Sequence, residues 1–294
     1  MTAFVSVVLG GVFHAAIIFL VAAGLQLVFG VQKILNLACG SFYALGAYFG
    51  ITAVAVTVEF GLPPALFLPA LILSGILIGF IGLPIEQLLR TIYRRDESYQ
   101  LLLTFGLLLI FQDVFHFFWG STPQTIGGGY YLAYGTTDIL GAQVPVYNLI
   151  VILASLLIAL GLGAFLQRTK TGRIIRATAE NRDMAEGLGV NAGRIFAVVF
   201  TVGCMLGTVG GALVVPSTAS SLSMAVDLVV EAFAVVVIGG LGSMRGAFVG
   251  ALIVGLMRAG AIYLMPEVEM LSIYLVVIAV LILRPAGLFG RAAA

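Results

Sequence analysis

Apolar stretches recur along this chain of 294 residues, each with the roughly 20 residues that a helix needs to cross a hydrocarbon core of about 30 Å. Hydrophobic residues make up 61% of the sequence and charged residues 9%, whereas typical soluble domains are about 25% charged. No change of composition or Pro/Ser-rich linker divides the chain. The sequence therefore predicts an all-α, polytopic membrane protein with a single transmembrane domain over residues 1–294.

Length and hydropathy predict about eight or nine membrane segments, some of them short or broken. Full spans are expected near residues 6–30, 38–58, 64–89, 98–119, 146–167, 194–215 and 246–265, and shorter ones near 228–242 and 270–284.

The basic residues indicate how these spans are oriented. Three arginines follow the third span, and six of the chain's 14 basic residues lie within 167–194. The loops 120–147 and 265–270 contain acids but no base. Because cytoplasmic loops are enriched in Lys and Arg, we expect a periplasmic N-terminus and a cytoplasmic C-terminus.

The long external loop between the fourth and fifth spans is rich in aromatic residues. Such residues are typical of a membrane–water interface, and an external docking surface is the alternative. The residues concerned are Trp119, Tyr130, Tyr131, Tyr134 and Tyr147.

Two segments interrupt the apolar pattern, residues 34–41 (ILNLACGS) and residues 237–246 (VIGGLGSMRG). Interrupted hydrophobic segments at matching places in two halves of a chain point to a transport site. The backbone groups that such breaks free must line a cavity or meet a protein neighbour. A short cytoplasmic turn with glycines for tight packing is the alternative, and it is favoured for the second segment, which contains Arg245.

Polar residues at broken or mid-span positions are the candidates for a translocation path. Charged residues inside a membrane are costly and are usually functional. Glu231 and Asp227, at the start of the short segment near 228–242, are expected to face the outer mouth, where they could meet a substrate ammonium or the binding protein. The candidates are Gln26, Asn36, Ser41, Thr104 and Glu231.

Other ionisable residues in the spans are expected to have local partners. Glu86 should pair with Arg90, four residues further along a helix, and Asp113 should hydrogen-bond to His116. His14, a lone polar residue in the first span, is expected to pack against a neighbour.

The chain shows no motif for a metal, cofactor or nucleotide. Cys39 and Cys204 are isolated thiols without C-x-x-C spacing, so they predict neither a metal site nor a disulfide. They are expected to be small buried core residues. The sequence has no G-x-x-x-x-G-K-[ST] phosphate loop. We expect no cofactor, metal or catalytic residue in this chain.

The polar island 167–194 must stand in water beside the membrane, because everything around it is apolar. Within it, residues 177–190 predict one short amphipathic helix, ended by Gly187 and Gly189. An ordinary loop that obeys the positive-inside rule is the alternative to a docking surface for a soluble partner. The apolar edge comprises Ala177, Met184, Ala185 and Leu188, and the polar face Glu180, Asn181, Arg182, Asp183 and Glu186.

Four segments resemble the permease subunits of bacterial branched-chain amino acid ABC importers, in the same order along the chain. They are NLACGSFYALGAY, TGRIIRATAENRDMAEGLGVN, VIGGLGSMRGAFVGAL and the terminal RPAGLFGR. The resemblance covers nearly the whole chain, whose length and N-terminal spacing are similar to the shorter of the two permeases in such systems. One departure is Cys39, where this permease group commonly has histidine, so no ligand contact is carried over to that position.

The resemblance implies a transport subunit of the bacterial inner membrane that does no covalent chemistry. A periplasmic solute-binding protein would deliver a branched-chain amino acid, or a related amide, urea or carboxylate, to a pair of permeases. The second permease would be a homologous, longer subunit, although pairing of two identical chains stays open. Two cytoplasmic ATPase subunits would use the ATP.

The same resemblance implies that the island is the element that couples the permease to an ATPase. We expect Met184, Ala185 and Leu188 to be apolar anchors, Glu180 and Arg182 to be rim contacts, and Ala177, Gly187 and Gly189 to complete the surface. Two other classes remain open: a stand-alone secondary transporter driven by an ion or proton gradient, and a membrane scaffold without transport activity.

Overall fold

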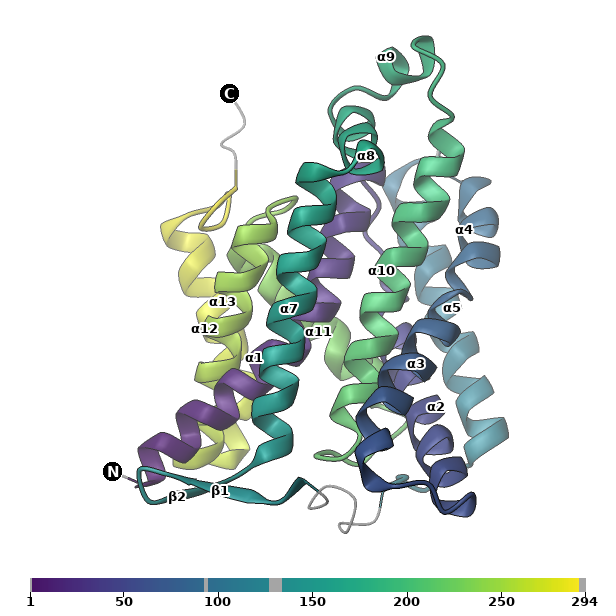
Figure 1. Ribbon diagram of the computed structural model, residues 1–294. Helices are drawn as coiled ribbons and strands as arrows, with labels where there is room; N and C mark the ends of the chain where they lie inside the picture. Colours follow the sequence, from purple (N-terminus) through teal and green to yellow (C-terminus); the bar gives the residue numbers. More distant parts are fainter. Residues whose placement is uncertain (1, 93–94, 127–133, 291–294) are drawn as a thin grey trace.

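The computed structural model describes residues 2–92, 95–126 and 134–290. It is a bundle of long helices, and the first and last described residues lie at opposite ends of it (Figure 1). The first half contains α1 (Thr2–Gln32), α2 (Cys39–Glu59), the short 3-10 helix η1 (Pro64–Leu66), α3 (Phe67–Gly79), α4 (Gly82–Arg90) and α5 (Glu97–Trp119).

The second half begins with a small antiparallel hairpin, β1 (Thr136–Ile139) and β2 (Ala142–Pro145). Helices follow: α7 (Val146–Arg168), α8 (Lys170–Glu180), α9 (Arg182–Gly187), α10 (Ala192–Val214), α11 (Met224–Gly239) and α12 (Met244–Leu264), then the 3-10 helix η3 (Pro266–Val268) and α13 (Glu269–Leu283).

The predicted membrane segments are confirmed as helices, with ends displaced by a few residues. Eight helical segments of the described chain are long and apolar enough to cross a membrane. The ninth predicted segment is α11, whose 16 residues give a length of about 24 Å. The third segment is less regular than expected, because α3 and α4 are separate helices that meet at Phe80 and Ile81.

Trp119 and Tyr147, at the two ends of the 120–147 region, have polar partners within the protein. Tyr147 is fully buried and donates a hydrogen bond from its hydroxyl to the carbonyl oxygen of Leu213 at 2.7 Å, so the expected position at a membrane–water interface is wrong for Tyr147. Trp119 donates from Nε1 to Thr52 Oγ1 at 3.2 Å. Tyr130 and Tyr131 lie outside the described residues.

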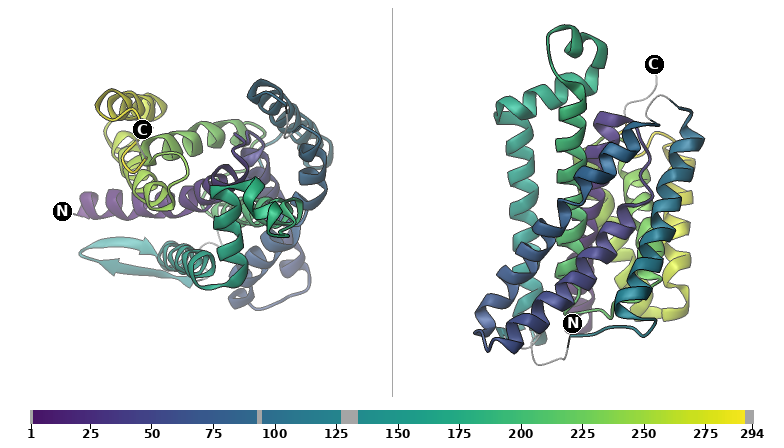
Figure 2. Two further views of the ribbon diagram at one scale, coloured as in Figure 1. Left: turned by 90° about the horizontal axis from the view of Figure 1, so that it is seen from above. Right: turned by 90° about the vertical axis from the view of Figure 1, so that its right-hand side faces the viewer.

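The core forms around α10, which packs against α1, α2 and α3 near the middle of the bundle (Figure 2). Glycines let α10 and α2 approach closely. A Cβ atom at Gly46 of α2 would collide with the carbonyl oxygen of Thr208, and one at Gly211 of α10 with that of Tyr43. Close backbone approach of this kind is how helices associate inside a membrane, where lipid is as apolar as the side chains.

We expect Gly46→Ala to destabilise the protein, because the added methyl group must push α2 away from α10. The loss should be about 1–3 kcal/mol of unfolding free energy, as for other overpacked cores, seen as a lower midpoint of thermal unfolding in detergent. Gly106 is the matched control, since a Cβ there meets nothing within 4 Å. Equal midpoints for Gly46→Ala and Gly106→Ala would contradict this packing.

Candidate functional site

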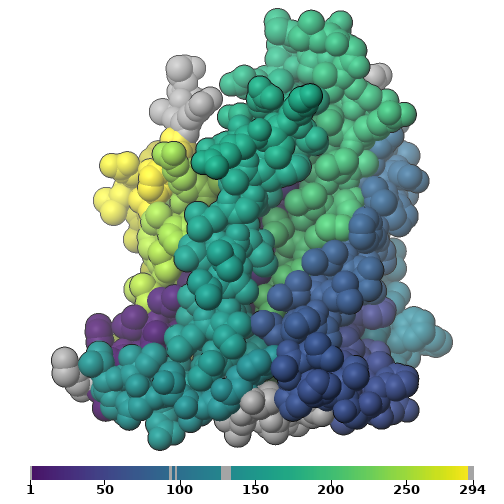
Figure 3. Space-filling model, viewed as in Figure 1, coloured from purple at the N-terminus to yellow at the C-terminus, as the bar shows by residue number. Residues whose placement is uncertain are grey.

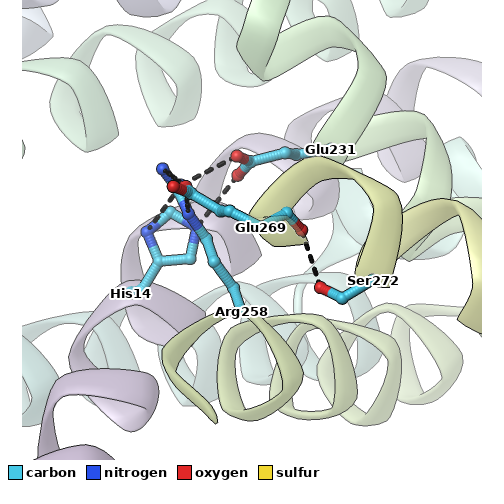
Figure 4. A network of polar contacts seen from close by, with 5 residues as sticks. All are labelled: His14, Glu231, Arg258, Glu269 and Ser272. Carbon is cyan, nitrogen blue, oxygen red and sulfur yellow. Dashed lines mark hydrogen bonds and ion pairs between the residues drawn. The ribbon is translucent and has the colours of Figure 1, made fainter. Parts of the chain in front are cut away.

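Four ionisable side chains from four helices meet at the end of the bundle that carries the N-terminus (Figure 4). Glu231 of α11 is at the centre. Its Oε1 lies 2.7 Å from Nη1 of Arg258 on α12, and its Oε2 lies 2.9 Å from Nε2 of His14 on α1. Arg258 also contacts Glu269 of α13, with 2.5 Å between Nη2 and Oε1. We call these four residues the ion network.

The ion network satisfies a carboxylate that would otherwise be costly. The Glu231 side chain is only 3% exposed, and an unpaired charge inside a protein costs several kcal/mol. His14 Nε2 also lies 2.8 Å from Arg258 Nη1. One ring nitrogen cannot both accept from Arg258 and donate to Glu231, so the proton on His14 decides which contact is a hydrogen bond.

Two cavities border this network. The outer one, of about 680 Å³, is lined by the first turns of α1 and the last turns of α12. The second, of about 200 Å³, is lined by Tyr43, Asp227 and Glu231 among others, and we call it the chamber. His14 and Arg258 line both. Together with Val214 and Thr218, these two side chains therefore form the wall that the outer cavity and the chamber share.

The sequence analysis identified Glu231 but missed the residues that hold it. Arg258 is a charged residue in the middle of an apolar span, which by itself indicates a buried partner. His14 does have a neighbour, as expected, although that neighbour is 217 positions away in the sequence. Only the packing of α1, α11, α12 and α13 brings the four together.

Gln26, a predicted path residue, anchors the second break. Its Nε2 donates to the carbonyl oxygen of Gly240 at 2.9 Å, and its Oε1 accepts from the amide of Gly242 at 2.5 Å. The turn 240–243 needs glycine at two positions, since Gly240 and Gly242 have φ of +95° and +82°. The favoured prediction of a glycine-bearing turn is confirmed for this break.

The chain terminus completes this arrangement. The amides of Leu288 and Phe289 donate to the carbonyl oxygens of Ile238 and Gly239, at 2.8 and 3.0 Å. These bonds satisfy carbonyl groups at the end of α11 that have no partner within the helix. Two of the segments singled out in the sequence, the second break and the terminal RPAGLFG, are thus in direct contact.

The other predicted path residues lie around the first break. Asn36 Oδ1 accepts from the amide of Ala38 at 3.0 Å and so helps to begin α2. Thr104 donates to the backbone of its own helix, to Gln100 O at 3.0 Å. The Ser41 hydroxyl is buried and has no hydrogen-bond partner among the described residues. None of these three lines the chamber, so the five predicted path residues do not form one site.

Of the remaining predictions about polar residues and cysteines, some are confirmed and one is wrong. Arg90 pairs with Glu86 at 2.8 Å, as expected. The prediction of a bond between Asp113 and His116 is wrong, because in the described structure both side chains lie exposed on α5 with no bond between them. Cys39 and Cys204 are buried free thiols, as expected. Within the described residues, no three His, Cys, Asp or Glu side chains gather into a group able to hold a metal.

The island's helix is two helices, so the prediction of one helix over residues 177–190 is wrong. The chain leaves α8 at Asn181, whose backbone is extended (φ −150°), and Asn181 Oδ1 then accepts from the amide of Met184 at 2.9 Å to begin α9. Asparagine is a preferred residue at a helix N-cap, which is why the break falls there. Gly189 follows α9 with φ of +87°, as expected for a glycine after a helix.

The α8–α9 segment projects beyond the ends of the neighbouring helices (Figures 2 and 3). Met184 and Leu188 are 66% and 82% exposed. Ala185 is buried in its own chain, at 5% exposure, which corrects its assignment as an anchor for a partner. Arg182 pairs with Glu186 at 2.9 Å and lies over the ring of Phe196.

Substitution of Arg258 should show how much the ion network stabilises the protein. We expect Arg258→Ala to cost about 3–5 kcal/mol of unfolding free energy, since it leaves Glu231 buried with an uncompensated charge. Glu231→Gln in the same chain should restore much of that loss. Arg182→Ala, which breaks an exposed pair, should cost about 1 kcal/mol or less. Similar thermal midpoints in detergent for the two arginine variants would refute a buried network.

Comparison with known proteins gives the family. The sequence profile described as "Branched-chain amino acid transport system / permease component" matches residues 7–282. The chain is 27% identical to the high-affinity branched-chain amino acid transport system permease protein BraD of Pseudomonas aeruginosa, over 92% of this chain and 91% of the relative. It is equally identical, with the same coverage, to the permease protein LivH of Escherichia coli K12.

A more distant similarity extends to sugar importers. The ribose import permease protein RbsC of Haemophilus influenzae is 26% identical over 81% of this chain and 72% of the relative. No solved structure matches the chain. These relatives are transport permeases and not enzymes, and they favour an ABC permease over a stand-alone carrier. With a family match that spans nearly all of its helices, the chain belongs to the permease components of branched-chain amino acid transport systems.

Proposed function

We propose that this permease forms the translocation path for a branched-chain amino acid or a related small solute in a binding-protein-dependent ABC importer. The observation that carries the proposal is the adjacent pair of cavities at one end of a chain that belongs to this family. Relatives that cover more than nine tenths of the chain are named for branched-chain amino acid transport.

The two cavities suggest the first part of the route. A periplasmic binding protein would release its solute into the outer cavity, and the solute would reach the chamber when the contacts of Arg258 and His14 rearrange. At the other end, the turn held by Gln26 would limit passage until it moves. The path therefore needs partners that supply energy, because both barriers are held by several hydrogen bonds or ion pairs.

The α8–α9 segment is the proposed contact with an ATPase subunit. Met184 and Leu188 present apolar surface to water at the tip of the molecule, and apolar anchors at the centre of an interface usually carry most of its energy. Glu180, Arg182, Ala177, Gly187 and Gly189 would surround them. ATP binding and hydrolysis are assigned to two such partner subunits, and no cofactor is assigned to this chain.

The proposed assembly includes a second, homologous permease. The proposed membrane orientation of this chain follows from the positions of its charged residues. Apart from Arg258, the described basic residues lie at the end that carries α8 and α9, whereas Asp138 and Glu267 lie at the other end. This distribution supports a cytoplasmic α8–α9 segment and C-terminus, with a periplasmic N-terminus.

We expect Leu188→Asp to abolish solute uptake and the retention of the ATPase subunits during purification, because it places a charge in a desolvated contact. The permease itself should still fold, since Leu188 is exposed. Leu140→Asp, at a similarly exposed position (72%) in the β1–β2 turn, is the matched control. If Leu188→Asp and Met184→Asp both keep wild-type uptake and co-purification, α8–α9 is not the coupling element.

Orientation is tested by single cysteines at exposed positions of opposite ends. Asp183→Cys in α9 should react with a membrane-impermeant maleimide only after the cytoplasmic side is opened, whereas Thr136→Cys in β1 should react in intact spheroplasts. The native thiols are buried, so the parent chain serves as the background. Reversed labelling would contradict the orientation and an importer with it.

A further inference from the structure

The chamber contains two polar groups that the ion network leaves unused. Asp227 lines it, and its exposed carboxylate makes no hydrogen bond or ion pair within the described chain. Tyr43 also lines it and is 94% buried, with 6% of its surface exposed; its hydroxyl likewise has no hydrogen-bond partner there. Both oxygens of Glu231, by contrast, are engaged by His14 and Arg258.

Asp227 lies one helical turn before Glu231 on α11, so the two side chains share a face of the helix. It belongs to the first turn of this 16-residue helix, where the helix dipole stabilises a negative charge. The fold therefore places the Asp227 carboxylate close to a buried ion network and without a partner of its own among the described residues.

The charges around the chamber are not balanced. Of the residues that line it, Asp227 and Glu231 are acids and Arg258 is a base, with His14 able to supply another positive charge. Arg258 is shared between Glu231 and Glu269, which lies beside the chamber. The rest of the wall includes the apolar side chains of Val214, Met224, Leu228 and Met270. A cavity of about 200 Å³ with excess negative charge and an apolar wall suits a small cation that carries an apolar body.

We propose that Asp227 and Tyr43 form a subsite for the protonated amine of the solute inside the chamber, next to the wall that Arg258 and His14 share with the outer cavity. The amine would donate one hydrogen bond to the Asp227 carboxylate and one to the Tyr43 hydroxyl oxygen. This inference rests on the proposed transport function for its ligand, and it assigns the amine to Asp227 because the carboxylate of Glu231 is already paired.

The charge of the chamber is tested with Ser221→Cys, because Ser221 lines the chamber but not the outer cavity. The purified transporter complex in detergent is treated with cationic and anionic methanethiosulfonate reagents of similar size. We expect the cationic reagent to react faster, and Asp227→Asn to reduce this preference about tenfold. Coulomb's law gives an effect of this size for one charge about 6 Å from the thiol in water, because the charge attracts one reagent and repels the other. Asp113→Asn, an exposed carboxylate on α5, should leave the preference unchanged.

The amine is tested by protection of the same cysteine. Isoamylamine is leucine without its carboxylate, and 4-methylpentanoate is leucine without its amine. We expect isoamylamine to slow labelling, and 4-methylpentanoate and sodium chloride to have no such effect. Asp227→Asn should remove the protection, Asp227→Glu should retain it, and Tyr43→Phe should weaken it severalfold.

Several results would overturn the subsite: no preference for the cationic reagent, a preference that Asp227→Asn leaves intact, or equal protection by the carboxylate or by sodium. Leucine uptake by the wild-type transporter in proteoliposomes, measured in parallel, keeps the two proposals apart. Uptake without amine protection rejects the subsite and leaves the transport function standing. Protection without uptake supports the subsite and rejects leucine as the transported solute.

Discussion

Backbone groups freed at a helix break inside a bilayer must find partners within the protein, because lipid offers none. In this bundle, the partners of the second break determine which helices are held together. The second break is held by one side chain, Gln26, whose amide group bonds to both Gly240 and Gly242. The terminal residues Leu288 and Phe289 satisfy the end of α11. The break thus ties α1, the α11–α12 turn and the chain terminus together.

The same helices also carry the charges at the opposite end. His14 and Gln26 are 12 residues apart on α1, which is about 18 Å along a helix. Glu231 and the turn at Gly240 are likewise on or next to α11. A shift of α1 relative to α11 and α12 would disturb the ion network and the Gln26 contacts together. The α8–α9 end is in contact with the same scaffold, since α8 packs on α7 and α1.

Local pattern was enough for much of the fold. Membrane segments were predictable because about 20 apolar residues cross a bilayer whatever surrounds them, and the Glu86–Arg90 pair because it depends only on helical spacing. Spacing alone misled for Asp113 and His116, which lie exposed on α5 without bonding to each other. It also misled in the island, where the N-cap at Asn181 overrides the amphipathic pattern and starts a second helix.

The sequence by itself determined the class of protein, its membrane segments, the ends at which its basic residues lie and the resemblance to one permease family. Tertiary structure alone decided which polar residues share a site. Glu231 and His14 are 217 positions apart, and no periodicity relates residues on separate helices. It also turned Gln26 and Asn36 into anchors of the breaks and left Asp227 and Tyr43 free in the chamber. Hydropathy reports the cost of placing a polar group in lipid, whereas the packing of the helices decides which residue becomes the partner of that group.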